Sequence, residues 1–168
     1  MGKKVRFLVR ASLIGAMYAA LTFLQNLLLP GSASWAIQFR ASEALCVLAF
    51  FDPAAIPGLS VGCFLFNLLY SGALPLDPIV GTLATALTAA AMYATRKWKL
   101  FGLPLLQMLL PAFFNAILVG WELDLYMGGG FWINALYVSI GEAAVLLTLG
   151  VLLYYAIRRS GSRLFMKE

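Results

Sequence analysis

Long apolar stretches separated by short clusters of basic residues run through the whole chain, and this alternation constrains the fold most. All of the 12 Lys and Arg residues except Arg40 fall in three clusters, at the start, the middle and the end. These clusters are Lys3, Lys4, Arg6 and Arg10; Arg96, Lys97 and Lys99; and Arg158, Arg159, Arg163 and Lys167. Charged side chains are costly in hydrocarbon, and loops rich in Lys and Arg tend to stay in the cytoplasm. The pattern predicts a membrane protein with all three clusters on one side of the bilayer.

The amino-acid composition also indicates that the chain lies in a membrane. The hydrophobic fraction is 62% and the charged fraction 11%, against about 45–50% and about 25% in soluble domains. Too little polar surface is available to cover this chain in water, so we expect a lipid bilayer around it. The net charge of +5 is carried at predicted helix ends, where it would meet lipid head groups rather than nucleic acid. We expect a single domain over residues 1–168.

The apolar stretches predict six transmembrane helices. A helix needs roughly 20 residues to cross the hydrocarbon, and the expected spans cover about residues 7–29, 41–51, 54–70, 78–95, 101–121 and 131–157. The second is about half the usual length, so we expect it to be tilted or to cross only part of the bilayer. The first apolar run is longer than the ~7–15 residues of a secretory signal, so we expect it to be a span that is not cleaved. The predicted fold is an all-α integral membrane bundle with both termini cytoplasmic.

Three loops are expected on the outer side, around residues 30–40, 71–77 and 122–130. Trp35, Trp121 and Trp132 fit an outer aromatic belt and Trp98 an inner one. Asp77, followed by a proline, is expected to cap the fourth span.

Small residues follow each other at four-residue spacing along the first span. One row contains Ala11, Gly15 and Ala19, and a parallel row contains Ser12, Ala16 and Ala20. Close helix packing in lipid favours such small residues. Either row therefore predicts packing inside the bundle or docking of another membrane protein, and spacing alone does not separate the two.

Ionisable residues inside a membrane are expensive and mark function by default. Arg40 and Glu43 lie three residues apart on one helical face, which predicts either an ion pair that holds the helix entry or a charged pair that lines a pocket. Glu142 lies in the middle of the last span with no basic residue within a turn. It must be buried against a partner, protonated, or facing a wet cavity, and we expect it to bind a ligand.

Neutral polar and aromatic residues complete the predicted pocket. Asn67, Asn115 and Asn134 lie in spans and are expected to form interhelical hydrogen bonds or to contact a ligand. Gln38, Phe39, Trp35, Tyr137 and Trp121 would close the pocket from the outer side. Aromatic faces that stack on a planar molecule, with polar groups that read its edge, are the usual recognition of a base. The expected ligand is planar and polar, with a guanine-like edge.

The sequence lacks the motifs that are typical of several classes of enzymes and metal-binding proteins. Histidine is absent, which removes the commonest metal ligand and catalytic base. Walker A, HExxH and GxSxG motifs are also absent, so we expect no catalytic residue, metal or cofactor. Cys46 and Cys63 fall in apolar stretches and are expected to be packing residues. One alternative stays open, a membrane-embedded enzyme that uses Glu43 and Glu142 as acid and base.

Several stretches resemble one transporter family. They are residues 37–45, 50–59, 62–63, 67–69, Asp77 with 81–85, 114–120, and 141–142 with 149–150. With them, nearly the whole chain resembles the S components of energy-coupling factor (ECF) transporters, and among those the queuosine precursor transporter (QueT) family.

The resemblance implies a six-helix protein of the bacterial plasma membrane that captures a 7-deazaguanine or another queuosine precursor outside the cell. It implies partners: a membrane T component and two ATPase subunits that use ATP and Mg. An A-x-x-x-A face on the first helix meets the T component in such proteins, and Ala16 and Ala20 match it. Arg40, Glu43, Asn67, Asn115 and Glu142 are the site residues at matching positions. An S component for another vitamin and a structural subunit without a ligand remain alternatives.

Overall fold

The computed structural model describes residues 2–32, 39–70, 72–98 and 104–160, and every regular element in these ranges is helical. The elements are α1 (Lys3–Leu28), η1 (Ala41–Phe50), α2 (Ala55–Leu69), α3 (Asp77–Thr95), α4 (Leu105–Met108), α5 (Leu110–Met127), α6 (Phe131–Val145), η2 (Leu146–Gly150) and α7 (Val151–Arg159). The predicted all-α class is confirmed for this part of the chain.

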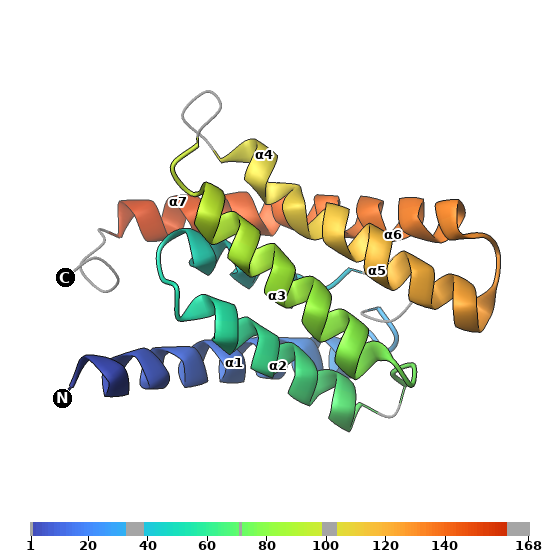
Figure 1. Cartoon of the computed structure of the whole chain (residues 1–168), viewed down its shortest axis with the longest axis horizontal. Coiled ribbons are helices and arrows are strands. Elements are labelled where there is room, and N and C mark those ends of the chain that lie inside the picture. The colour runs from blue at the N-terminus through green and yellow to red at the C-terminus, as the bar shows by residue number, and fades with distance from the viewer. Residues whose placement is uncertain (1, 33–38, 71, 99–103, 161–168) are drawn as a thin grey trace.

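Within the described ranges, four helical segments are long and apolar enough to cross a membrane: Lys3–Leu28, Asp77–Thr95, Leu105–Met127 and Phe131–Arg159. They lie roughly along one direction, and the start of α1 and the end of α7 lie at the same end of the bundle (Figure 1). The ends of α1, α2 and α5 lie at the opposite end (Figure 1). We call the end that holds the start of α1 and the end of α7 the basic end, and the opposite one the loop end.

The predicted short second span is an internal element. Residues Ala41–Phe50 form a 3₁₀-helix in which Ser42–Phe50 are all buried. It packs against α1, α2, α3, α6, η2 and α7. Ten residues at about 2.0 Å rise cover roughly 20 Å, so the tighter helix stretches a short segment through much of the bundle. Neighbouring helices surround η1, which explains why an apolar sequence too short to span the bilayer alone is found here.

Glycines bring α1 and α2 into close contact. A Cβ added at Gly15 would lie 2.8 Å from the carbonyl oxygen of Gly58, and one added at Gly62 would lie 2.5 Å from that of Gly15. A Cβ at Gly58 would lie 2.6 Å from the carbonyl oxygen of Ala11. The two backbones therefore touch, and the row that contains Ala11 and Gly15 packs inside the bundle.

The fifth predicted span ends too early. Its predicted start at residue 101 lies outside the described residues, and the described helix begins at Leu105. The helix continues to Met127 instead of ending at residue 121, and it stops where Gly128 adopts a φ of 72°. Glu122, predicted to lie in an outer loop, is fully buried against the bundle. The helix therefore includes Glu122, and only residues 128–130 separate α5 from α6.

The last span is one long helix with a wider turn inside it. α6, η2 and α7 follow each other without a gap from Phe131 to Arg159, which confirms the helix predicted at 131–157. The middle part, Leu146–Gly150, is a π-helix that packs on η1. A wider turn changes the face that a helix presents, and Glu142 lies just before this change.

Candidate functional site

Glu43 has both carboxylate oxygens occupied inside the bundle. The side chain is 1% exposed at the start of η1. The Tyr18 hydroxyl of α1 donates a hydrogen bond to Oε1, and the Cys46 thiol donates to Oε2 over 3.3 Å. Glu43 therefore links α1 to η1.

Arg40 also points into the bundle, immediately before η1. Its side chain is 5% exposed, and its charge interacts with Tyr18, Cys63, Asp77 and Glu43. A Cβ added at Gly81 of α3 would lie 3.9 Å from Arg40 Nη1. The predicted proximity of Arg40 and Glu43 is present, and the guanidinium also reaches α2 and α3.

Glu142 of α6 joins these charged groups from the other side. It is 1% exposed and interacts electrostatically with Glu43 and Arg40. Its Oε2 is buried without a hydrogen bond from any described residue. A buried acceptor without a donor is costly, so this oxygen is available for a ligand that brings an N–H group.

Asn67 connects α2 to α3. Its Nδ2 donates to the carbonyl oxygen of Asp77 over 3.0 Å and contacts Cys63 Sγ at 3.5 Å. The interhelical hydrogen bond expected for a membrane amide is therefore present. Asn67 Oδ1 is buried without a hydrogen bond from the described residues, and it is a second available acceptor.

Asp77 and Glu122 form a buried pair that the sequence patterns above do not predict. Asp77 is 4% exposed and Glu122 is fully buried, and the two carboxyl groups interact electrostatically. Neither Glu122 oxygen has a hydrogen-bond partner among the described residues. Asn115, Val119 and Glu122 follow at helical spacing in one buried stripe of α5. That periodicity is the signal that could have revealed Glu122.

The predicted cap role of Asp77 is wrong. No side chain caps the start of α3. Asp77 Oδ2 instead accepts the backbone N–H of Leu74 over 2.6 Å, which closes the turn before the helix. The proline that suggested a cap lies in the first helical turn, a position that needs no capping side chain.

Hydroxyl groups of α1 and η1 extend the polar cluster. Thr22 and Ser42 are both fully buried, and their hydroxyls form a hydrogen bond of 2.7 Å. Neither residue was predicted, nor was Tyr18. Tyr18 and Thr22 lie one helical turn apart in an otherwise apolar stretch, which is the only local signal they offer.

The remaining predicted site residues lie at different depths. Asn115 is buried in α5, 5% exposed. Asn134 donates from Nδ2 to the Gly128 carbonyl over 2.9 Å and holds the loop before α6. Phe39 and Tyr137 are 47% and 40% exposed, so neither belongs to the buried cluster. Gln38 lies outside the described residues.

The buried cluster joins distant parts of the chain and holds both charge signs. One guanidinium and several carboxyl, amide and hydroxyl groups converge from α1, the segment around η1, α2, α3, α5 and α6. Within the described residues, no group of three or more His, Cys, Asp or Glu side chains could hold a metal ion. The available chemistry is hydrogen bonding and charge recognition.

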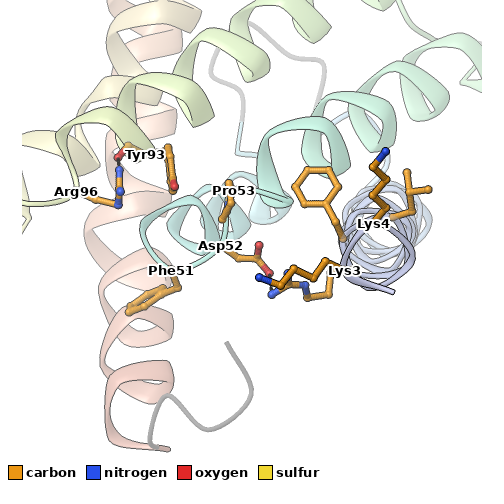
Figure 2. Close-up of a pocket in the computed structure, with 10 residues that line it drawn as sticks. Lys3, Lys4, Phe51, Asp52, Pro53, Tyr93 and Arg96 are labelled. Atoms are coloured by element: carbon orange, nitrogen blue, oxygen red, sulfur yellow. Dashed lines mark hydrogen bonds and ion pairs between the residues drawn. The ribbon is translucent and has the colours of Figure 1, made fainter. Parts of the chain in front are cut away.

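A distinct cavity of about 700 Å³ lies at the basic end of the bundle (Figure 2). The start of α1, the turn after η1 and the end of α3 line it. Its residues include none of the predicted ligand-binding set, so this cavity and the buried polar cluster are separate features.

Helices of membrane-spanning length around a buried, charged cluster define an integral membrane protein with an internal polar site. A family model described as QueT transporter matches residues 8–159. The chain belongs to the QueT transporter family, which makes it a membrane transporter rather than an enzyme and confirms the predicted family. No curated protein and no solved structure matches the chain.

Proposed function

We propose that this chain is the substrate-binding S component of an ECF importer and captures a queuosine precursor of the 7-deazaguanine type from outside the cell. Membership of the QueT transporter family supports this proposal. The structural observation that carries it is the convergence of Arg40, Glu43 and Glu142 in the bundle interior.

The hydrogen-bonding capacity of the cluster fits a donor-rich edge. Glu43 is already occupied by Tyr18 and Cys46. Glu142 Oε2 and Asn67 Oδ1 remain as buried acceptors. The guanine-like edge of a 7-deazaguanine presents adjacent N–H donors, which suit a carboxylate, while a nearby guanidinium suits the ring carbonyl. In this proposal Glu142 reads the donor edge and Arg40 the acceptor.

The proposed orientation follows from the basic clusters. Lys3, Lys4, Arg96 and Lys97 lie at the basic end, which the positive-inside rule assigns to the cytoplasm. Of the six predicted passes, the second runs inside the protein as η1. The ligand then enters at the loop end, close to the exposed side chains of Phe39 and Tyr137.

The proposed energising partners are a T component and two ATPases, which supply ATP and Mg chemistry that this chain does not carry. Of the two small-residue rows on α1, the row with Ser12, Ala16 and Ala20 is exposed. Gly15 of the other row is buried against α2. Ala16 and Ala20 are therefore the proposed docking residues, since no long side chains must move when the partner docks or leaves.

A ligand panel tests the proposal. Purified protein in detergent is titrated with 7-cyano- and 7-aminomethyl-7-deazaguanine, queuine, guanine and several vitamins, and thermal stability is recorded. A ligand that binds only the folded protein stabilises it. Stabilisation by a 7-deazaguanine but not by the vitamins supports the proposal. Stabilisation by a vitamin alone assigns a different substrate to the same site, and no response to any 7-deazaguanine contradicts the proposal.

A further inference from the structure

The cavity at the basic end carries a strong excess of positive charge. Lys3, Lys4, Arg10 and Arg96 line it, and among the described lining residues Asp52 is the only acid. Figure 2 shows Asp52 and Pro53 at the centre of the wall, with Tyr93 and Arg96 on one side and Lys3 and Lys4 on the other. The cations thus come from separate elements and surround one space.

Asp52 is already neutralised. Its Oδ2 forms an ion pair of 3.1 Å with Arg10, and its side chain is fully buried. Its Oδ1 accepts the backbone N–H of Ala54 over 2.9 Å, which holds the turn into α2. Because Arg10 and Asp52 compensate each other, the charges of Lys3, Lys4 and Arg96 remain for an anion.

Arg96 is held in place before any anion arrives. Its guanidinium carbon lies 3.8 Å from the centre of the Tyr93 ring. Its Nη1 donates to the Tyr93 carbonyl over 2.6 Å. A guanidinium has five N–H donors in a fixed fork that suits phosphate oxygens, and this bond uses one of them.

The rest of the described cavity lining is mostly apolar and continues onto an exposed face of α1. Phe7, Leu8 and Phe51 also line it, and Leu8 is 62% exposed on a helix of membrane-spanning length. The cavity lies where α1 begins and α3 ends, at the depth of lipid head groups. A cationic pocket between membrane helices with an apolar side matches a head group that continues into acyl chains.

We infer that this cavity binds the phosphate group of an anionic phospholipid, with Lys3, Lys4 and Arg96 on the phosphate and the acyl chains along the apolar side of α1. Free phosphate shares the polar chemistry, but it would leave the wall of Phe7, Leu8 and Phe51 unused. This site is separate from the proposed 7-deazaguanine site and does not depend on that function.

The first experiment uses the unmodified protein in detergent. Thermal stability is measured with phosphatidylglycerol, with phosphatidylcholine and with inorganic phosphate at equal concentrations, and native mass spectrometry counts retained lipids from a mixture of the two. We expect preferential stabilisation and retention by phosphatidylglycerol. Equal effects of the two lipids, or an inorganic phosphate effect as large as that of phosphatidylglycerol, would overturn the lipid assignment. Equal lipid effects would leave the cavity to an acidic segment of a partner protein.

The second experiment compares two double variants of equal net charge. Lys4→Gln with Arg96→Gln removes two cavity cations, whereas Arg6→Gln with Lys97→Gln removes two exposed cations that do not line it. Each cation that contacts a head group contributes roughly a fivefold factor in affinity, so we expect about 25-fold weaker phosphatidylglycerol binding in the first variant only. Equal weakening in both variants would contradict a defined site. If the first variant does not fold, the comparison of lipids on the unmodified protein decides.

Discussion

At the scale of single residues, Glu43 and Glu142 are equally buried but have different hydrogen-bonding environments. Glu43 accepts hydrogen bonds from Tyr18 and Cys46 on its two oxygens. Glu142 has a buried oxygen without a donor among the described residues. The first is therefore expected to serve the fold and the second the ligand, although both are acids in apolar helices.

Replacing Glu142 by Gln tests this division. The amide retains the shape but loses the charge and one acceptor. Because a hydrogen bond to a charged group contributes about 1.5–3 kcal/mol, we expect binding of the best 7-deazaguanine to weaken by about 10- to 100-fold. Isothermal titration of purified protein measures it. Asp124→Asn, an acid at the α5 end outside the cluster, is the control. Unchanged affinity in Glu142→Gln would remove Glu142 from the site.

Replacing Tyr18 by Phe tests the structural role of Glu43. The change removes the donor to Glu43 Oε1 and leaves a buried acceptor unpaired, which costs about 1–3 kcal/mol of the free energy of unfolding. Thermal denaturation in detergent should show the loss. Tyr155→Phe is the matched control, because Tyr155 is 47% exposed. Equal stability of the two variants would mean that the Tyr18 bond contributes little.

At the scale of elements, the α1–α2 contact separates the two small-residue rows of α1. The Gly15 row touches the α2 backbone at Gly58 and Gly62. The Ala16 row faces outward. The same spacing thus has two roles on one helix, and only the neighbouring helix distinguishes them.

Two substitutions, one at this contact and one on the exposed face of α1, should have different effects on stability. In Gly62→Ala the new Cβ meets a backbone oxygen of α1 at 2.5 Å, so the helices must separate, and overpacking of this kind costs about 1–3 kcal/mol. In Ala16→Leu the larger side chain faces the exterior. We expect a lower melting temperature for Gly62→Ala and an unchanged one for Ala16→Leu.

The same pair tests docking. Ala16→Leu should retain ligand binding but reduce co-purification with the T component and uptake into cells, because the bulky side chain keeps the partner helix away. If Ala16→Leu assembles and transports as well as the parent, the exposed row of α1 is not the docking face.

At the scale of the whole molecule, η1 carries the chain back through the interior of the bundle between α1 and α2. This return does not need a full-length helix that faces lipid. Its ten residues are shielded by helices on several sides. α1 begins and α7 ends at the same end of the bundle (Figure 1), which fits the proposed topology with both termini in the cytoplasm.

Cysteine labelling tests the proposed orientation. Cys46 and Cys63 are fully buried, so they should give little background with a membrane-impermeant maleimide. We expect Gly129→Cys to react in intact cells, and Lys97→Cys and Ser160→Cys to react only after the membrane is opened. Labelling of Lys97→Cys in intact cells would place the basic end outside and reverse the direction of the importer.

The sequence by itself determined the solvent, the helical class and the family, because these depend on local composition, on the spacing of apolar and basic residues and on motif stretches. The positions of most helices followed from the same patterns. Arg40, Glu43 and Glu142 were singled out because ionisable residues in apolar stretches are costly wherever they lie; their burial is shown, and their role in ligand binding stays a prediction.

Only the tertiary structure decided which helices contact each other and which side chains they bury between them. The 3₁₀ geometry of η1, the extension of α5 past Glu122, the pairing of Glu122 with Asp77 and the burial of the Gly15 row each depend on a neighbouring helix. Periodicity describes one helix at a time, whereas a shared hydrogen bond or a backbone contact belongs to two helices far apart in the sequence. The free energy of such a contact depends on both helices that form it, so the pattern of one helix does not predict it.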